Sequence, residues 1–212
     1  SPIALTGAGG DGLDVAFQGD VTPAGAVRGR AGVTVADLQA FAALAGAPLS
    51  GPGSAAANVD FGPGGLALDD IAVTGHGATV SGRAMLDPSF KTISAALKLA
   101  APQLGELAKL ANAPISGAVS GDFALSGAVA DPAATVALRF KPLVAGGERF
   151  AEAALSVNAT TLVSGPKGAF KASAQSPYGR VTAESQFALK GDALALKSLK
   201  LGAPGAAAKF SL

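Results

Sequence analysis

The chain has 212 residues, with 16 basic and 15 acidic side chains and a formal net charge of +1. This near balance, without a long block of one sign, argues against a polybasic surface for nucleic acid or membranes. Cysteine is absent, which excludes disulfide bonds and thiolate metal sites. The sequence also lacks the run of about 18 apolar residues that would predict a membrane-spanning helix.

Alternation of apolar and polar residues dominates the sequence, and a two-residue period is typical of a strand with one apolar face. The first clear stretch runs from Leu13 to Phe17, and others follow between residues 93 and 189. Segments such as FGPGG (61–65) and LDPSF (86–90) separate them and are typical of turns. Turn signals recur about every 10 to 15 residues, which favours an antiparallel meander over βαβ units.

Two stretches have helical spacing instead. VADLQAFAALAG (35–46) has Gly46 as a natural left-handed terminator, and APQLGELAKLANAP (101–114) has Asn112 in the same role. Each predicted helix is only about three turns long and would be marginal alone. We therefore expect both helices to dock on an apolar surface.

Part of the sequence is repeated. LAGAPLSG (44–51) and LANAPISG (110–117) match at an offset of 66, and the similarity extends to residues 33–51 and 99–117. The repeated unit reads as strand, short helix, left-handed stop, proline and new strand, which favours extension of a sheet by stacking.

A second pair of segments, LALDDIAV (66–73) and LALKSLKL (194–201), shares one spacing of apolar residues. Two residues separate the paired apolar positions in the middle of each segment, so the strand must change its facing there. This spacing predicts a bulge or a tight turn.

The sequence contains no convincing catalytic motif. GAGGDG (7–12) has dinucleotide-loop spacing, but a strand pattern follows it where a helix is required, so we predict a hairpin turn. His76 is the only histidine and is expected to be solvated in a turn. Asp69 and Asp70 would point to opposite faces of a strand and are interpreted as a turn. We predict a non-enzymatic protein without metal or cofactor.

The apolar face leaves two architectures open. A closed β-sandwich would explain the alternation. However, the apolar positions mix many Ala and Gly residues with medium-sized aliphatic ones, which would fill a closed core thinly. An open sheet extended by stacking is the other interpretation.

The texture of the whole chain resembles the TamB family, and LKLAAPQLGELAKLANAPISGAVSGDFALSGAVADPAATVAL (97–138) resembles its alphaproteobacterial members most closely. This family comprises inner-membrane subunits of the translocation and assembly module and is related to AsmA-like proteins. The resemblance implies a periplasmic, β-rich body curled into a taco-like trough with a hydrophobic interior. It also implies phospholipid transport between the two membranes and outer-membrane protein assembly with an Omp85-type barrel partner.

We therefore expect residues 1–212 to be one excised segment of a larger envelope protein, with an inner-membrane anchor outside the segment. The expected fold is all-β with two short helices, arranged as a curled antiparallel or mixed sheet. Three functions are considered: a groove for phospholipid acyl chains, a scaffold that accepts unfolded strands by β-augmentation, and a structural β-sandwich. The candidate groove-lining residues are Leu13, Val15, Phe17, Ile93, Leu97, Leu99, Val119, Phe123, Leu125, Val136, Leu138, Phe140, Leu155, Val157, Phe170, Val181, Phe187 and Leu189.

Overall fold

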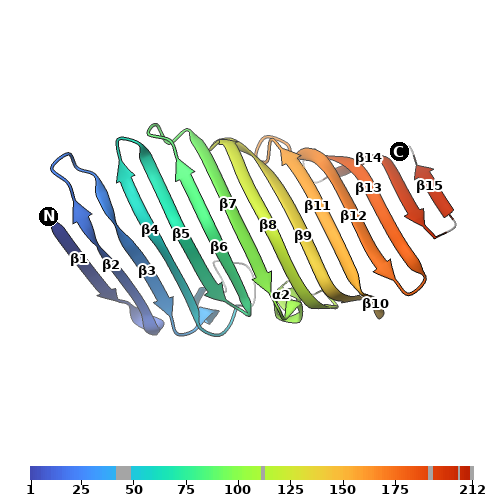
Figure 1. The fold of residues 1–212 in the computed structure, drawn as a ribbon, viewed down its shortest axis with the longest axis horizontal. Coiled ribbons are helices and arrows are strands. Elements are labelled where there is room, and N and C mark those ends of the chain that lie inside the picture. Colours follow the sequence, from blue (N-terminus) through green and yellow to red (C-terminus); the bar gives the residue numbers. More distant parts are fainter. Residues whose placement is uncertain (42–48, 111–112, 191–192, 205, 211–212) are drawn as a thin grey trace.

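A computed structural model describes residues 1–41, 49–110, 113–190, 193–204 and 206–210. The chain forms one antiparallel sheet in which fourteen of the fifteen strands follow one another in chain order, while β10 pairs only with β9 (Figure 1). The strands are β1 (Pro2–Ala8), β2 (Leu13–Val21), β3 (Val27–Val35), β4 (Gly53–Gly62), β5 (Gly65–Gly75), β6 (Ala78–Leu86), β7 (Thr92–Ala101), β8 (Ile115–Ala128), β9 (Asp131–Ala145), β10 (Glu148–Phe150), β11 (Glu152–Thr160), β12 (Lys167–Ser176), β13 (Gly179–Lys190), β14 (Ala193–Ala203) and β15 (Ala206–Phe210). The predicted all-β meander is confirmed. The described residues form no second sheet, so the closed β-sandwich is wrong for them.

Three short helical segments connect consecutive strands, all at the same end of the strands. We call this end of the sheet the helical rim. The segments are η1 (Gly10–Gly12) between β1 and β2, η2 (Leu38–Phe41) between β3 and β4, and α2 (Leu104–Leu110) between β7 and β8. The helix α2 confirms the second predicted helix. Only the 3₁₀ turn η2 is described within the first, and Gly46 and Asn112 lie outside the described residues. The segment 7–12 is part of the β1–β2 hairpin, as predicted.

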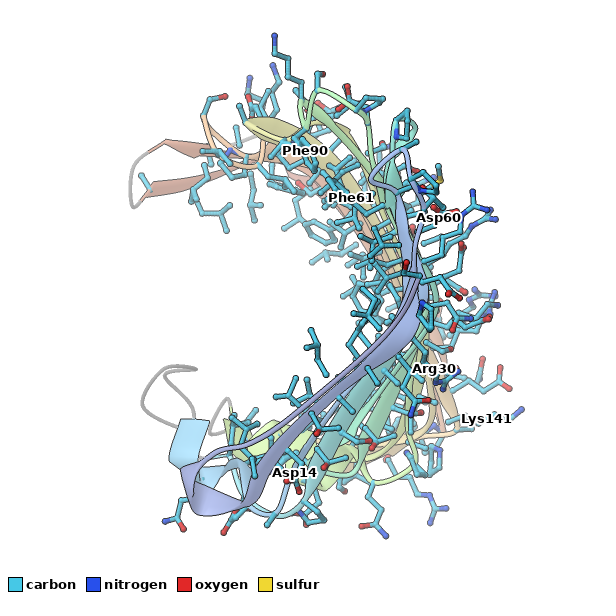
Figure 2. All side chains as sticks on the ribbon, turned by 90° about the vertical axis from the view of Figure 1, so that its left-hand side faces the viewer. Asp14, Arg30, Asp60, Phe61, Phe90 and Lys141 are labelled. Carbon is cyan, nitrogen blue, oxygen red and sulfur yellow. The ribbon has the colours of Figure 1, made fainter. Side chains whose placement is uncertain are left out.

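The strands curve along their length, so the sheet is C-shaped when viewed along its long axis (Figure 2). Arg30, Asp60 and Lys141 lie on the outer side of the curve, whereas Phe61 and Phe90 lie on the inner side. Residues paired across neighbouring strands share a face, so the register assigns every paired position to the inner or the outer face. One inner row contains Val15, Val33, Ala55, Val73, Val80, Leu99, Gly121, Leu138, Leu155, Ala172, Ala183 and Leu201.

Very little of the sheet is buried. Among the described residues, the buried apolar ones are Val35, Ala101, Leu104, Ala108 and Val119. The solvent-accessible surface of the chain is 12848 Å². A compact protein of this mass is expected to expose roughly 8,800 Å². The excess follows from the single-layer architecture, which leaves one apolar face without a second layer against it.

The two LAL segments form matching bulges. β5 has one extra residue between Leu68 and Ile71, and β14 has one extra residue at the equivalent place, near Ser198. Asp70 and Ser198 have φ values of 50° and 54°. The predicted bulge is confirmed. However, Asp69 and Asp70 lie within a strand and not in the turn that we expected, because the bulge absorbs the extra residue.

The register repeats at the offset of 66 that relates residues 33–51 to residues 99–117. The matching cross-strand pairs are Val35 with Gly53 on β3 and β4, and Ala101 with Val119 on β7 and β8. Leu38 lies over the first pair, close enough that a Cβ atom at Gly53 would collide with it. Leu104 packs on the second pair. Both units thus place an apolar side chain of a helical segment on the inner face at the helical rim.

Gly82 on β6 tests the strand pairing directly. Its φ is +152°, and a Cβ atom there would collide with the carbonyl oxygen of Ala96 on β7. We expect Gly82→Ala to lower the free energy of unfolding by about 1–3 kcal/mol, because it adds both backbone strain and overpacking. Gly7→Ala is the matched control, since a Cβ atom at Gly7 meets no atom within 4 Å. Urea denaturation measures both variants, and equal destabilisation would contradict the β6–β7 register.

We call the strand ends opposite the helical rim the turn rim. Asp131 holds a loop in place there. Its Oδ1 accepts hydrogen bonds from the backbone N–H groups of Val163 (3.1 Å) and Ser164 (3.4 Å), and its Oδ2 accepts one from the Ser164 hydroxyl (2.5 Å). These bonds, the hydroxyl bond above all, hold the pKa of Asp131 below its usual value. The carboxylate therefore ties the β11–β12 loop to the start of β9.

This arrangement predicts acid-dependent protection of the loop. Because the folded-state pKa is lowered, the carboxylate stabilises the loop above the ordinary aspartate pKa of about 3.9, and this contribution is lost as the pH falls through the lower folded value. Asp131→Asn should accelerate hydrogen exchange of the Val163 and Ser164 amides at neutral pH. Asp20→Asn, at an exposed position, is the control and should leave both rates unchanged. Unchanged rates in Asp131→Asn would contradict this role.

Candidate functional site

The inner face of the sheet is apolar over its whole length. From Ile3 on β1 to Leu201 on β14, the inner positions of the paired strands carry Ala, Gly, Val, Leu, Ile, Phe or Pro, apart from Glu148, Ser176 and Ser185. The Ser185 hydroxyl lies within hydrogen-bonding distance of the carbonyl oxygens of Gln186 (3.0 Å) and Lys197 (2.9 Å). Glu148, on the short strand β10 at the helical rim, is the one charged residue among the described inner positions of the paired strands.

The register brings all eighteen candidate groove-lining residues to this inner face. The predicted residues of β2, from Leu13 to Phe17, join those of β7 through the row that contains Val15 and Leu99. That row continues through Leu138 and Leu155 to β14. Side chains far apart in the sequence therefore line one continuous curved surface.

Sequence reasoning missed several members of the same surface. Val33, Val73 and Leu201 occupy the central inner row, and Leu5 and Phe61 lie in neighbouring rows. The signal for Val73 and Leu201 was present in the two LAL segments. It was obscured because a bulge interrupts the two-residue period there.

The inner face remains open to solvent. Val15, Val33, Val73 and Leu201 of the central row are 45%, 37%, 38% and 42% exposed. Residues of a closed β-sandwich core at such positions would be almost fully buried. The exposure shows that the curvature alone does not bring opposite walls of the trough into contact along this row.

The helix α2 covers one limited part of the inner face. Leu104 packs with Ala101 and Val119 at the helical rim, and Leu99, Leu138 and Phe140 pack against this cluster. Ala108 of the same helix is also buried. The helix thereby narrows the trough near the middle of the sheet without closing it. Amphipathic spacing in the sequence predicted docking of this kind.

His76 differs from its predicted role. It is half-buried in the β5–β6 turn, with Nε2 2.9 Å from the carbonyl oxygen of Glu106 in α2 and Nδ1 3.4 Å from that of Ser50. The expectation of a solvated histidine is wrong, because the turn faces the backbone of the neighbouring helical connection. Its φ of 49° places the ring between those two carbonyl groups.

An aromatic pair marks the turn rim on the inner side (Figure 2). The Phe61 and Phe90 ring centroids are 6.3 Å apart with an interplanar angle of 33°. Phe90 has a φ of 55° in a turn that Asp87 holds by accepting hydrogen bonds from backbone N–H groups of Ser89, Lys91 and Thr92 and from the Ser89 hydroxyl. These bonds, the Ser89 hydroxyl bond above all, strongly lower the pKa of Asp87.

Charged side chains pair on the outer face. Arg28 with Asp60, Lys98 with Asp122, Lys141 with Glu152, and both Lys171 and Lys200 with Glu184 form the ion pairs. The hydrogen bond between Lys141 and Glu152 raises the pKa of the lysine and lowers that of the glutamate, and the Lys200 hydrogen bond lowers the pKa of Glu184. Because all of these side chains are exposed, the pairs contribute little to stability. They keep charge away from the trough.

The described residues offer no metal centre, since their Asp, Glu and His side chains form no group of three that could hold an ion. Within the same residues, no helix has the length and apolar character to cross a membrane. The inner face is therefore the main candidate site.

No protein-family model, curated protein or solved structure matches the chain. The resemblance to the TamB family stays a prediction.

If the trough is open, the same substitution should lower the free energy of unfolding more at an inner position covered by α2 than at an uncovered one. Val119 is 6% exposed beneath α2, whereas Val136 is only half-buried on the uncovered surface. We expect Val119→Ala to lower the free energy of unfolding by about 1–2 kcal/mol and Val136→Ala to cost about half as much or less. Chemical denaturation in the absence of lipid and detergent measures the difference. Equal, large costs would indicate a covered core at Val136.

Proposed function

We propose that the inner face binds phospholipid acyl chains and shields them from water, and that the chain is a non-enzymatic part of a lipid-transporting envelope protein. The observation that carries this proposal is the continuous inner surface from β1 to β14, which is apolar, half-exposed and uncharged except for Glu148 at the helical rim. Periplasmic location, transport between the inner and outer membranes and an Omp85-type partner belong to the same proposal, and they derive from the resemblance to the TamB family.

The energetics favour an acyl ligand. An exposed methylene group costs about 0.8 kcal/mol relative to an apolar environment, so a 16-carbon chain costs roughly 12 kcal/mol in water. The apolar wall is itself exposed, and a bound acyl chain would remove both surfaces from water together. Sparse Leu and Phe side chains between Ala and Gly positions leave space for flexible chains, and such a surface imposes no fixed hydrogen-bond geometry.

The dimensions also fit. Neighbouring strands lie about 4.8 Å apart, so fourteen strands extend the trough over roughly 60 Å. An acyl chain in one leaflet spans half of the ~30 Å hydrocarbon core of a bilayer. The trough is therefore long enough for several chains in succession, as a conduit requires.

A second candidate function is a scaffold for the assembly of outer-membrane strands. The observation that favours it is that β1 is an edge strand: the side of β1 away from β2 pairs with no other described strand. The seven residues of β1 would add an incoming extended segment by main-chain hydrogen bonds, as β-augmentation requires. Acyl binding uses the face of the sheet and augmentation uses its edge, so separate experiments address them.

Adjacent residues on β7 and β8 allow a sharp test of the acyl-chain proposal. Leu97 pairs with Phe123 on the inner face, and their neighbours Lys98 and Asp122 pair on the outer face. A photo-crosslinking amino acid is placed at each position in turn, and the protein is incubated with vesicles that contain a phospholipid with a labelled acyl chain. We expect strong labelling from positions 97 and 123 and little labelling from positions 98 and 122, because a shift of one residue reverses the face.

Equal labelling from both faces, or none from the inner face, would refute the groove. Crosslinks from β1 to unfolded outer-membrane proteins, without lipid labelling at Leu97, would favour the scaffold instead. Native mass spectrometry of the purified chain gives an independent measurement, since bound phospholipid should appear as a defined increment in mass.

A further inference from the structure

Charge is distributed unevenly along the sheet. Residues 1–90 carry three basic and eight acidic side chains, a net charge of −5, whereas residues 91–212 carry thirteen basic and seven acidic ones, a net charge of +6. Because the strands follow one another in chain order, this asymmetry in sequence is also an asymmetry in space (Figure 1). The half of the sheet from β7 onward therefore has a positive potential on its outer face.

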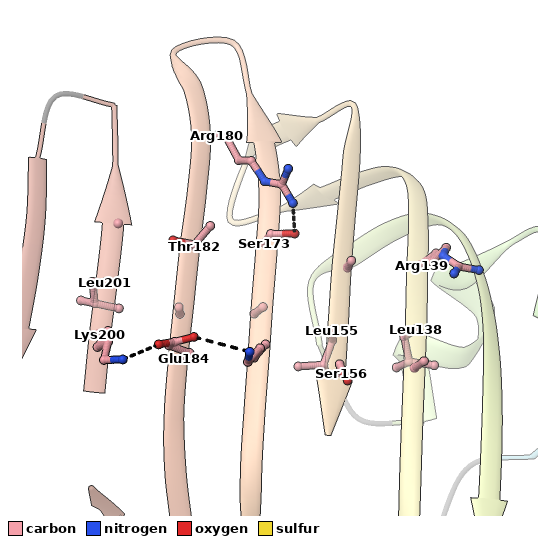
Figure 3. A pocket seen from close by; sticks show the side chains of 16 residues that line it. Leu138, Arg139, Leu155, Ser156, Ser173, Arg180, Thr182, Glu184, Lys200 and Leu201 are labelled. Carbon is pink, nitrogen blue, oxygen red and sulfur yellow. Dashed lines mark hydrogen bonds and ion pairs between the residues drawn. The ribbon is translucent and has the colours of Figure 1, made fainter. Parts of the chain in front are cut away.

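A hollow of about 650 Å³ concentrates that charge over β9 to β14 (Figure 3). Arg139, Lys171, Arg180 and Lys200 line it together with one carboxylate, Glu184, so its charged lining carries a net charge of +3. Its lining includes small residues such as Ala154 and Ser173, which occupy the strands between the two arginines. The volume is in the range of pockets that bind small molecules.

Both arginines have N–H donors that are not used in hydrogen bonds with described residues. The Arg180 Nη2 atom donates one hydrogen bond to the Ser173 Oγ atom, at 3.3 Å, and Arg139 has no hydrogen bond or ion pair with any described residue. Glu184 lies 2.8 Å from Lys200 Nζ and 4.0 Å from Lys171 Nζ, so the lysines already share its charge. On the arginine side, Glu152 lines an adjoining hollow with both arginines, but it forms an ion pair with Lys141 at 2.6 Å.

The Arg180 side chain turns toward β12. The hydrogen bond to Ser173 brings its guanidinium back over β12 (Figure 3). Only β11, with Ala154, then separates it from β9, which carries Arg139. Two spacings of about 4.8 Å separate β12 from β9, and the Arg139 side chain points away from Arg180 (Figure 3), so a single tetrahedral oxyanion does not span both guanidinium groups.

A second hollow on the outer face has a similar size but the opposite charge. It measures about 540 Å³ and is lined by three carboxylates, Asp69, Asp70 and Asp122, with Arg83 and Lys98, a net charge of −1. Size alone therefore does not distinguish the hollow at Arg139 and Arg180. Its net charge of +3 does.

We propose that the hollow lined by Arg139, Lys171, Arg180 and Lys200 is a binding site for phosphate-monoester groups. Guanidinium groups present paired N–H donors that match the oxygens of a phosphate, and this makes arginine the preferred residue for such recognition. Lys171 and Lys200 add positive charge at the far wall. The inference does not rest on acyl-chain binding, because the charged side chains that carry it lie on the outer face of the sheet.

Titration calorimetry with inositol hexakisphosphate, and flotation with phosphatidylcholine vesicles that contain or lack phosphatidic acid, test the site. The double variant Arg139→Ala/Arg180→Ala should weaken binding of the responding probe at least about tenfold. Arg83→Ala/Lys98→Ala removes the same charge from the other hollow on the same face, and it should change binding less than about threefold. If the first double variant loses its circular dichroism spectrum, Arg139→Gln and Arg180→Gln singly replace it.

Each outcome decides the proposal. Selective loss of inositol hexakisphosphate binding supports a soluble phosphate ester as ligand, and selective loss of binding to phosphatidic acid vesicles supports a lipid headgroup. Equal weakening in both double variants would show unspecific attraction to the positive half of the sheet and would overturn the site, as would the absence of binding to both probes. Acyl-chain labelling at Leu97 is a separate readout, so failure here is distinguishable from failure of the lipid groove.

Discussion

A single-layer sheet with one apolar face cannot bury that face by itself, and this constraint governs the rest of the structure. Stable domains normally bury an apolar sheet face against a second layer. Here the strands curve, α2 covers one patch, and Val15, Val33 and Val73 stay more than a third exposed. The fold is therefore complementary to something apolar that it does not itself contain. That incompleteness is the physical reason to look for a ligand on the inner face.

The two-residue period separates two chemistries across the thickness of one backbone. Lys98 and Asp122 pair on the outer face, one residue from Leu97 and Phe123 on the inner face. A ligand in the trough would meet a mostly hydrocarbon surface, while a ligand on the outer face meets charge and small polar residues. The two surfaces can therefore serve different partners without interference, and the sheet needs no second domain to keep them apart.

The sequence predicted the strands, the antiparallel meander and α2, because each depends on local periodicity and turn chemistry. It left the sandwich and the open sheet as alternatives, since alternation looks the same whether an apolar face is covered or not. His76 was misjudged because its partners, the carbonyl groups of Ser50 and Glu106, are distant in sequence. The positive half of the sheet was overlooked for another reason. Its charges are spread over many strands, and only the meander order converts them into one surface.

Continuity of the trough depends on register, and the bulges maintain it. Without the extra residue in β5, the positions after Leu68 would be displaced by one. Ile71 and Val73 would then face outward, and Asp70 would face the trough. The bulge at Asp70, with its φ of 50°, prevents this, and Ser198 has the same role in β14. Backbone conformations of this kind are unfavourable for residues other than glycine. Asp70 and Ser198 nevertheless adopt such a conformation, and the resulting bulges keep the leucine and isoleucine side chains of β5 and β14 on the inner face. The unfavourable backbone conformations at the two bulges thus preserve the continuity of the apolar inner face.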